Sequence, residues 1–508
     1  MSRSLPRFAL PFVALSLLAA CGDSPETLLG KAQDSLARED FDQARVEVAS
    51  ALQEDPGNAA MLEVLARAYL GLGDPDGAEG ALRRLEQAGG TGSGLSVLKA
   101  EIALLRGRPA EALERLGTAE GEDAARVRAE ANLALDRREA AIAAFEAGME
   151  QGGGIRLAEA YARFRLQDGQ FDAAEAIYRR MVARDAGAYE TLVLAGDLAA
   201  ARGQTEAAIA AFRKVVEAYP DRPAPRVALA NQYDIKGDVE AATKAIETAR
   251  KDLGATPEIE AMRIQLLSEK GEWETIRTTL QAREAQLEPG SPLSLSYGEA
   301  LLRLGHAEQA RVLFQRASLA LPGNPYSRLM LGIAQIETDN PGDAWETLRP
   351  LAMSPLAGPQ AINAARQAAD AVGAPEAAAL AARLEPARLK AAQARIEGGA
   401  RAMARQEWAK AVAIYQPMLS GAGDAEVLRR LALAHMHMGE VESAVGYADR
   451  AMAQAPDNPD CIYVAGVVRL EGGMQLEKAR QLLRMAAKAD PGNAAISRSL
   501  AKAKAAEG

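Results

Sequence analysis

The feature that most constrains this chain is an internal repeat of about 34 residues. The tetrapeptide Asp-Pro-Gly-Asn occurs at 55–58 and again at 490–493, and related Pro-containing turns lie at matching phases, at 322–325 and 456–459. In a chain that repeats one short unit, each unit buries its apolar side chains against its neighbours. The 508 residues are therefore predicted to form one repetitive array rather than several globular domains.

Each unit has the pattern of two amphipathic helices joined by a glycine turn. In the sixth unit we expect helices over 189–201 and 205–218, with Gly203 between them and Pro220 after the second. Glycine adopts the left-handed conformation that ends many helices, and proline cannot continue one. The fourteen units begin near residues 25, 59, 93, 122, 155, 189, 223, 257, 291, 325, 359, 392, 425 and 459.

Small residues recur at two positions of the unit. The eighth is Ala or Gly in twelve of fourteen units, and the twentieth is Ala in twelve. The twenty-fourth is mostly large and apolar, as in Val48, Phe145 and Phe212. Two antiparallel helices cross tightly only where the facing residues are small. The eighth-position residues are Ala32, Ala66, Ala100, Ala129, Ala162, Gly196, Ala230, Gly298, Gly332, Gly399, Ala432 and Gly466.

This pattern resembles the tetratricopeptide repeat (TPR) and holds over nearly all of residues 25–493. The resemblance implies an all-α fold, a right-handed α-solenoid superhelix of about fourteen TPR-like helix-turn-helix units. A closing helix and tail are expected over 494–508.

Four units depart from the pattern, and unit fourteen does so through one extra residue near Gly472-Gly473 that moves its small residue to Ala479. Unit three is about 29 residues long, so its second helix should end near Leu116. Unit eight has isoleucine at both small positions, and unit eleven has Arg366 and Ala382 where a small and a large residue are expected. Because burial of apolar surface stabilises each joint, we expect the softest joints near 257–290 and 359–392.

The first twenty residues have the pattern of an export signal. Residues 8–20 form a 13-residue uncharged stretch after two arginines, which fits a signal peptide and is shorter than the ~20 residues that span a bilayer. The following Leu18-Ala19-Ala20-Cys21 resembles the lipobox of bacterial lipoproteins, which implies cleavage before Cys21 and acyl chains, palmitate among them, on that residue. Residues 21–24 would then be a lipidated tether. The alternative is an ordinary signal peptide that ends beside a cysteine.

Composition argues against several functions. The net charge is −10, with 59 basic and 69 acidic residues, so no nucleic-acid partner is expected. Two cysteines do not make a disulfide scaffold. His435 and His437 are two residues apart, which places them on different helix faces, and His306 follows a turn glycine. Cys461 is expected to be a buried, inert thiol. We therefore expect no catalytic centre, no metal and no cofactor.

The remaining candidate is a binding surface for protein or peptide partners. In TPR proteins the first helices line the concave face, with positions two, five, nine and twelve usually facing the groove. The ninth position is polar in units one to nine and mostly apolar in the last five. The apolar strip could bind a partner, or it could be buried between coils of the superhelix. Asn231 sits where some TPR domains hold a peptide carboxylate, but the partnering lysine is missing. The candidate residues are Arg163, Asp197, Asn231, Tyr326, Leu329, Ile333, Ile336, Leu433, Met436 and Tyr463.

Three functional hypotheses follow. The first is a lipid-anchored, periplasm-facing scaffold in the cell envelope, with the outer membrane favoured over the inner. Segments 24–29, 41–44, 51–56 and 69–74 resemble the TPR lipoproteins of exosortase and exopolysaccharide (PEP-CTERM) systems. Other TPR lipoproteins assemble outer-membrane proteins or pili. The second is a carbohydrate-handling protein or enzyme, which should have an aromatic or carboxylate cluster. The third is a cytosolic regulator whose start is misread.

Overall fold

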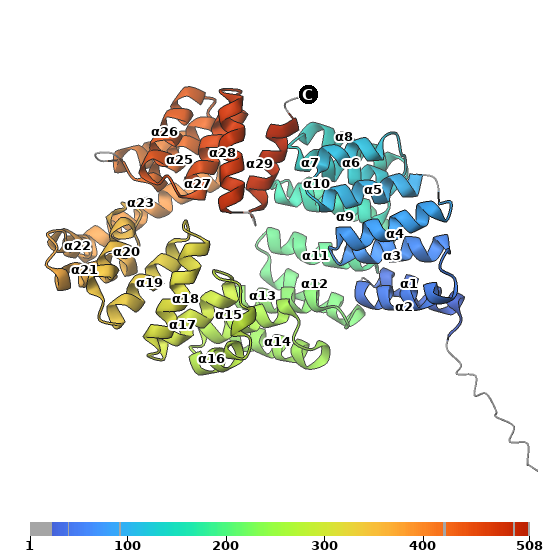
Figure 1. Ribbon diagram of the computed structural model, residues 1–508, viewed down its shortest axis with the longest axis horizontal. Helices are drawn as coiled ribbons and strands as arrows, with labels where there is room; N and C mark the ends of the chain where they lie inside the picture. Colours follow the sequence, from blue (N-terminus) through green and yellow to red (C-terminus); the bar gives the residue numbers. More distant parts are fainter. Residues whose placement is uncertain (1–22, 39, 91–92, 420–422, 491–492, 506–508) are drawn as a thin grey trace, which may run out of the picture. The chain divides into compact units, whose positions relative to one another are not determined.

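The computed structural model describes residues 23–38, 40–90, 93–419, 423–490 and 493–505. Within these ranges the chain forms 29 α-helices and two short 3-10 helices, and no strand (Figure 1). The predicted signal peptide and Cys21 lie outside the described residues. The chain divides into two compact bodies, residues 1–120 and 121–508.

The first body contains three helix pairs, and the second contains eleven pairs followed by α29. The stacked helix pairs form the α-solenoid architecture that the repeat predicts. The helices of the first body are α1 Pro25–Ala37, α2 Phe41–Glu54, α3 Ala59–Gly71, α4 Pro75–Gln87, α5 Ser93–Leu105 and α6 Pro109–Leu116. Those of the second body are α7 Glu122–Ala134, α8 Arg138–Glu150, α9 Ile155–Gln167, α10 Phe171–Arg184, α11 Tyr189–Ala201, α12 Thr205–Ala218, α13 Pro223–Ile235, α14 Val239–Leu253, α15 Pro257–Glu269, α16 Trp273–Gln281, α17 Pro292–Arg303, α18 Ala307–Ala320, α19 Pro325–Glu337, α20 Pro341–Met353, α21 Pro359–Val372, α22 Ala377–Arg383, α23 Pro386–Ala404, α24 Trp408–Tyr415, α25 Ala425–His437, α26 Val441–Gln454, α27 Pro459–Glu471, α28 Leu476–Ala489 and α29 Ala494–Ala505. The two 3-10 helices are η1 Glu284–Gln286 and η2 Gln416–Met418.

The turn between the two helices of a unit has the same geometry along the array. In each unit whose fifteenth residue the structure describes, that residue has a positive φ, as in Gly203 with φ 69°. Glycine fills this position in most units because it has no Cβ to oppose the left-handed conformation. Asp136, Asp339 and Gln406 adopt it with side chains, at φ 57°, 58° and 57°.

The small eighth residue receives the large twenty-fourth residue of the same unit. A Cβ added to Gly196 would lie 2.6 Å from the Phe212 ring, and one on Gly298 would lie 2.6 Å from the Phe314 ring. The sequence predicts that the large residue fills space against the following unit. Phe212 does share a cluster with Leu229 of that unit. Its ring is also in close contact with Gly196 of its own unit. This contact sets how closely each helix pair crosses.

The second helix is short in units three, eight and eleven, and also in unit twelve, where α24 has eight residues and is followed by η2. In unit three, α6 ends at Leu116, as the sequence predicts. In unit eight, α16 has nine residues and gives way to η1, while Ile264 and Ile276 are buried together in one cluster. In unit eleven, α22 has only seven residues. The next helix, α23, begins at Pro386, six residues before the predicted start at 392, because proline is favoured in a first helical turn.

None of the described helices combines the length and the hydropathy needed to span a bilayer.

Candidate protein interaction surface

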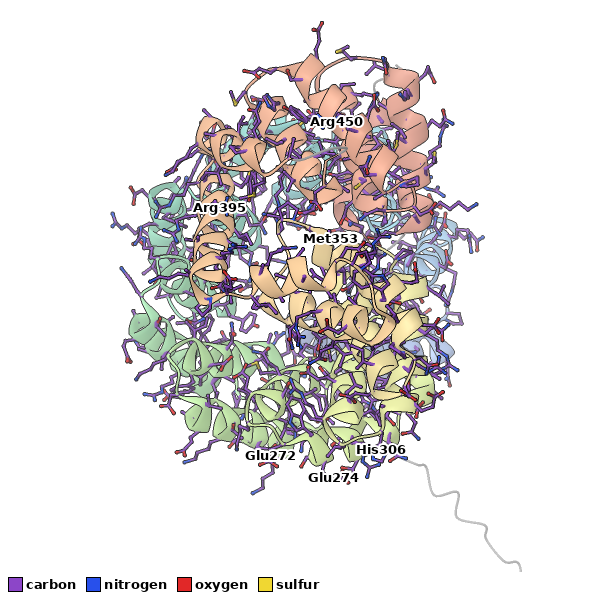
Figure 2. The ribbon with its side chains drawn as sticks, turned by 90° about the vertical axis from the view of Figure 1, so that its left-hand side faces the viewer. Glu272, Glu274, His306, Met353, Arg395 and Arg450 are labelled. Atoms are coloured by element: carbon purple, nitrogen blue, oxygen red, sulfur yellow. The ribbon has the colours of Figure 1, made fainter. Side chains whose placement is uncertain are left out.

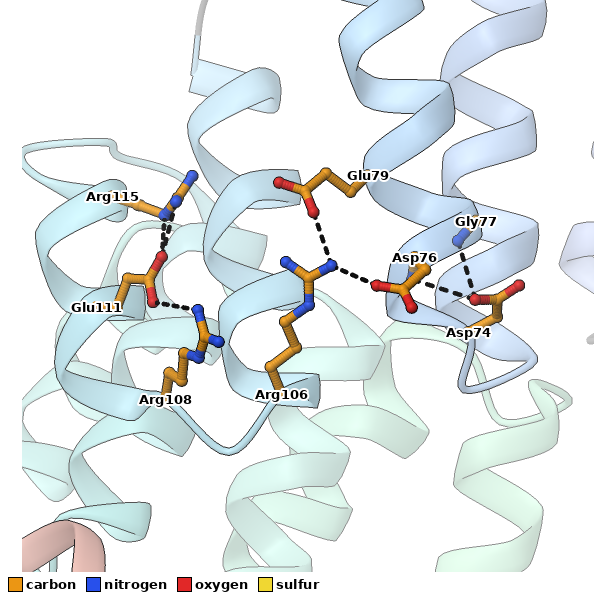
Figure 3. A network of polar contacts seen from close by, with 8 residues as sticks. All are labelled: Asp74, Asp76, Gly77, Glu79, Arg106, Arg108, Glu111 and Arg115. Atoms are coloured by element: carbon orange, nitrogen blue, oxygen red, sulfur yellow. Dashed lines mark hydrogen bonds and ion pairs between the residues drawn. The ribbon is translucent and has the colours of Figure 1, made fainter.

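Ion pairs join successive units at the turn edge of the array. In the first body, Arg106 at the end of α5 contacts both Asp76 and Glu79 of α4, each at 2.6 Å (Figure 3). In the second body, Arg202 pairs with Asp172 at 3.3 Å, and Lys236 pairs with Glu206 at 2.7 Å. In all three cases a cation at position fourteen meets an acid at position eighteen of the preceding unit, thirty residues earlier. These exposed pairs orient neighbouring units more than they stabilise them.

A second set of contacts caps helix ends across unit boundaries. Arg180 of α10 donates to the carbonyl of Met149 at 3.0 Å, at the end of α8. Arg84 of α4 donates to the carbonyl of Pro56 at 3.2 Å, just after α2. Both arginines occupy position twenty-six of their units. A cation is favourable there because the carbonyls at a helix C-terminus are unpaired and carry partial negative charge.

The predicted ninth-position residues lie where the first helices of neighbouring units meet. Arg163 of α9 lies 3.6 Å from Asp197 of α11, and its Nε donates to Glu159 at 2.8 Å. Between α13 and α15, Gln265 donates to Asp234 at 3.0 Å and to Glu269 at 3.2 Å. Polar contacts thus join the first helices of units five and six and those of units seven and eight.

Two carboxyl groups at these contacts are partly dehydrated. Burial raises the pKa of Asp197, and the nearby Arg163 guanidinium opposes the shift. Burial also raises the pKa of Glu269, with a further increase from the neighbouring Asp234 carboxylate. Removing a carboxylate from water disfavours its charged form. Both carboxyl groups are therefore protonated more readily than fully hydrated acids.

Tyr326 connects two further first helices. Its hydroxyl donates to Glu299 of α17 at 2.7 Å, and Arg303 donates to the same carboxylate at 3.2 Å. Burial and the Glu299 contact raise the pKa of Tyr326, so the hydroxyl stays a donor at neutral pH. The residue as a whole remains 37% exposed.

The predicted apolar strip is half-buried. Leu329, Ile333 and Ile336 of α19 pack against the cluster around Trp345 and Leu348 of α20. In the last units, Leu433, Met436 and Tyr463 pack against the cluster of α26 to α28, and the Tyr463 hydroxyl lies 3.2 Å from that of Ser499. These side chains thus contribute to the core with one part of their surface and leave another part open. Asn231 is exposed on α13.

The histidines occupy three different surroundings. His435 is buried, lies 2.6 Å from Glu440 and stacks on Tyr447. His437 stacks on Trp408 with ring centroids 4.3 Å apart, so the two histidines do face different neighbours. Figure 2 shows His306 at the same edge as Glu272 and Glu274, and all three are exposed.

Cys461 and the three tryptophans lie in different units of the described chain. The predicted buried thiol, Cys461, is 1% exposed, and burial raises its pKa to about 11. In the described part of the chain, no group of three or more histidine, cysteine or acidic side chains is arranged to hold a metal. Trp345 is buried, and Trp273 packs against the core of units eight to ten.

The ion pairs between positions fourteen and eighteen are absent from the sequence-based candidates. Their partners belong to different units and recur in only some of them. The signal that could have revealed them is the fixed thirty-residue offset between a cation after the first helix and an acid in the previous second helix. Aligning the units by position, instead of reading each helix alone, exposes that offset.

Three segments match tetratricopeptide repeat models, at residues 35–102, 165–223 and 427–462. Among solved structures, a chain in the crystal structure of the APC/C hetero-tetramer Cut9-Hcn1 is 13% identical, with 94% of this chain and 96% of that chain covered and a TM-score of 0.38. A tetratricopeptide repeat protein from Parabacteroides merdae is 16% identical, with 58% and 99% covered and a TM-score of 0.31. No curated protein matches this chain. Within these three segments, the helix pairs are therefore similar to tetratricopeptide repeats.

Proposed function

We propose that this protein is a non-catalytic scaffold that binds protein partners along the first helices of its repeats, while anchored by lipid to the envelope of a bacterial cell. The observation that carries the proposal is a set of three polar contacts between neighbouring first helices, Arg163–Asp197, Gln265–Asp234 and Tyr326–Glu299. They join α9 to α11, α13 to α15 and α17 to α19, and they include partly dehydrated carboxyls, an amide group and a partly exposed tyrosine. Such a mixture of charge, hydrogen-bonding groups and aromatic surface is typical of protein interfaces.

The anchoring part of the proposal rests on sequence. The Leu18-Ala19-Ala20-Cys21 motif follows an uncharged stretch of signal-peptide length. Acylation at Cys21 with more than one chain would give a stable tether, whereas a single chain holds a protein only reversibly. The tether would keep the array at a membrane surface facing the periplasm, with the outer membrane favoured.

The setting that the sequence favours is a PEP-CTERM type of exopolysaccharide or protein export system. This rests on the resemblance of segments 24–29, 41–44, 51–56 and 69–74. An outer-membrane protein or pilus assembly factor is the second candidate, because lipid-anchored TPR proteins also serve those pathways.

Two experiments test these points. A photo-crosslinking amino acid at Asn231 or at Tyr326 should capture envelope proteins in living cells, whereas the same group at Leu319 on the second helix α18, which is 76% exposed, should capture far less. Equal yields from all three positions would contradict a first-helix interface. Labelling with an alkyne fatty acid should mark the wild type and not Cys21→Ser, which should leave the membrane fraction. A Cys21→Ser protein that stays with membranes would contradict the anchor.

A further inference from the structure

Helix α23 has few buried residues for its length. With 19 residues it is the longest of the described α-helices, yet only Gly399 and Ala402 in it are buried. Its preceding second helix, α22, spans seven residues, about half the length of most second helices in the array. No residue in the first three turns of α23 is buried.

This helix is cationic in an acidic chain. Between 386 and 405 there are five basic residues and one acid, Glu397, although the whole protein has a net charge of −10. Arg388 pairs with exposed Glu385 at 3.2 Å. Arg395, labelled in Figure 2, donates only to the Ala391 carbonyl of its own helix, at 3.4 Å. The other cations are Lys390, Arg401 and Arg405.

Two of the arginines share a face with two apolar side chains. Arg388 and Arg395 are seven residues apart, as are Leu389 and Ile396, so both pairs repeat along one side of the helix. Leu389 and Ile396 are half-buried, and the two arginines are exposed. We name this surface the α23 face and define it by Arg388, Leu389, Ala392, Arg395 and Ile396.

We infer that the α23 face binds an acidic, amphipathic segment of a partner protein. Guanidinium groups pair with carboxylates through two parallel hydrogen bonds, and a spacing of seven residues matches carboxylates two turns apart on a partner helix. Leu389 and Ile396 would pack against apolar residues between them. The inference rests on the proposed scaffold function and names the chemistry of one of its partners.

Other occupants fit this surface less well. A second copy of the chain, docked face to face, would bring Arg388 and Arg395 against the same arginines. A membrane-binding helix needs a broad apolar side, and here it would consist of Leu389 and Ile396, both already half-buried. Anionic lipid is therefore an outcome of the test rather than the proposed ligand.

The test uses the full chain with Cys21→Ser and a fluorescent helical peptide of fifteen residues. The peptide carries Glu residues seven apart with Leu between them, and its counterpart has Lys in place of Glu. The first variant, Arg388→Glu/Arg395→Glu, changes the α23 face. The matched variant, Lys390→Glu/Arg401→Glu, makes the same charge change on the other side of the helix. Circular dichroism melts confirm folding, and Arg388→Gln/Arg395→Gln replaces the first variant if it unfolds.

The wild type should bind the Glu peptide and not the Lys peptide. Affinity should fall about ten-fold or more in the first variant and less than about three-fold in the matched one. Equal losses in both variants, no binding to the Glu peptide, or binding only to vesicles with 30% phosphatidylglycerol would each overturn the inference. If crosslinks at Asn231 and Tyr326 persist in that case, the scaffold function stands and only the α23 partner is wrong.

Discussion

The ring of Phe212 lies against the backbone of Gly196, so close that a Cβ on the glycine would be 2.6 Å from a ring atom. Both residues belong to unit six, in α11 and α12, and Phe212 is 3% exposed. The ring therefore leaves no room for a side chain at the eighth position of this unit. Where the twenty-fourth residue is aromatic and the eighth is glycine, the pair behaves as one packing element.

Replacing Gly196 with alanine should destabilise the second body by about 1–3 kcal/mol, because the buried ring has no room to shift. Chemical denaturation measures the loss. Gly446→Ala provides the matched control, since a Cβ there meets no atom within 4 Å and lies inside α26. It should stabilise by roughly 0.5–1 kcal/mol through helix propensity. Equal effects at the two sites would contradict the packing role.

Gln406→Gly should raise stability by roughly 1 kcal/mol, because Gln406 holds φ 57° with a side chain attached. Gln406→Ala keeps the Cβ and should leave stability nearly unchanged. Thermal melting of the three proteins measures both effects. An alanine variant as stable as the glycine variant would show that backbone conformation is not the cause.

Asp449→Ala should destabilise by about 3 kcal/mol, because it leaves the fully buried Arg469 guanidinium without a carboxylate. Asp449 accepts two hydrogen bonds from Arg469, at 2.7 and 2.6 Å. Asp457→Ala, at an exposed position nearby in sequence, should change stability by less than about 0.5 kcal/mol. Urea denaturation distinguishes a local loss near α26 to α28 from a global one.

Asp197→Asn should make the protein more stable at pH 7 and flatten its pH dependence. The pKa of Asp197 is raised in the folded state, so its contribution to stability is fully present below its ordinary value of 3.8 and is lost as the pH rises through the raised pKa. Denaturation between about pH 4 and pH 7 measures the difference. Asp221→Asn, at an exposed site, should not change the slope. The opposite sign for Asp197 would contradict its dehydration.

Amide hydrogen exchange should be fastest, among the helices of the second body, near unit eleven. In α22 the only buried residue is Leu380, and the following turns of α23 bury none until Gly399. Opening of a repeat is local because each unit contacts only its neighbours. Uniformly strong protection across 359–392 would contradict this prediction, and helices α27 and α28 supply a well-packed reference. The predicted soft joint near 257–290 is measured in the same experiment.

Much of the fold follows from residue spacing. Both helices of unit six begin and end at the residues that the sequence predicts, because Gly203 and Pro220 mark their ends. The sequence pattern places the start of unit twelve six residues too late. The reason is that aligning the unit on its small residue, Gly399, takes no account of extra helical turns before it. Pro386, a favoured first-turn residue, was the available signal.

The candidate surface follows less directly from the sequence. Ninth-position spacing places Arg163 and Asp197 next to each other, as the structure does. It cannot tell how deeply Leu329, Ile333 and Ile336 are covered, because that depends on Trp345 in the next helix. Which partner such a surface selects depends on chemistry that is spread over several units.

The thirty-residue offset between Arg106 and Asp76 recurs between Arg202 and Asp172 and between Lys236 and Glu206. These three junctions between units therefore share one type of ion pair at equivalent positions. A unit gained or lost between two such junctions would keep the same cation–acid contact at its seam. Duplication there would lengthen the array, and with it the reach of the protein, in steps of one unit.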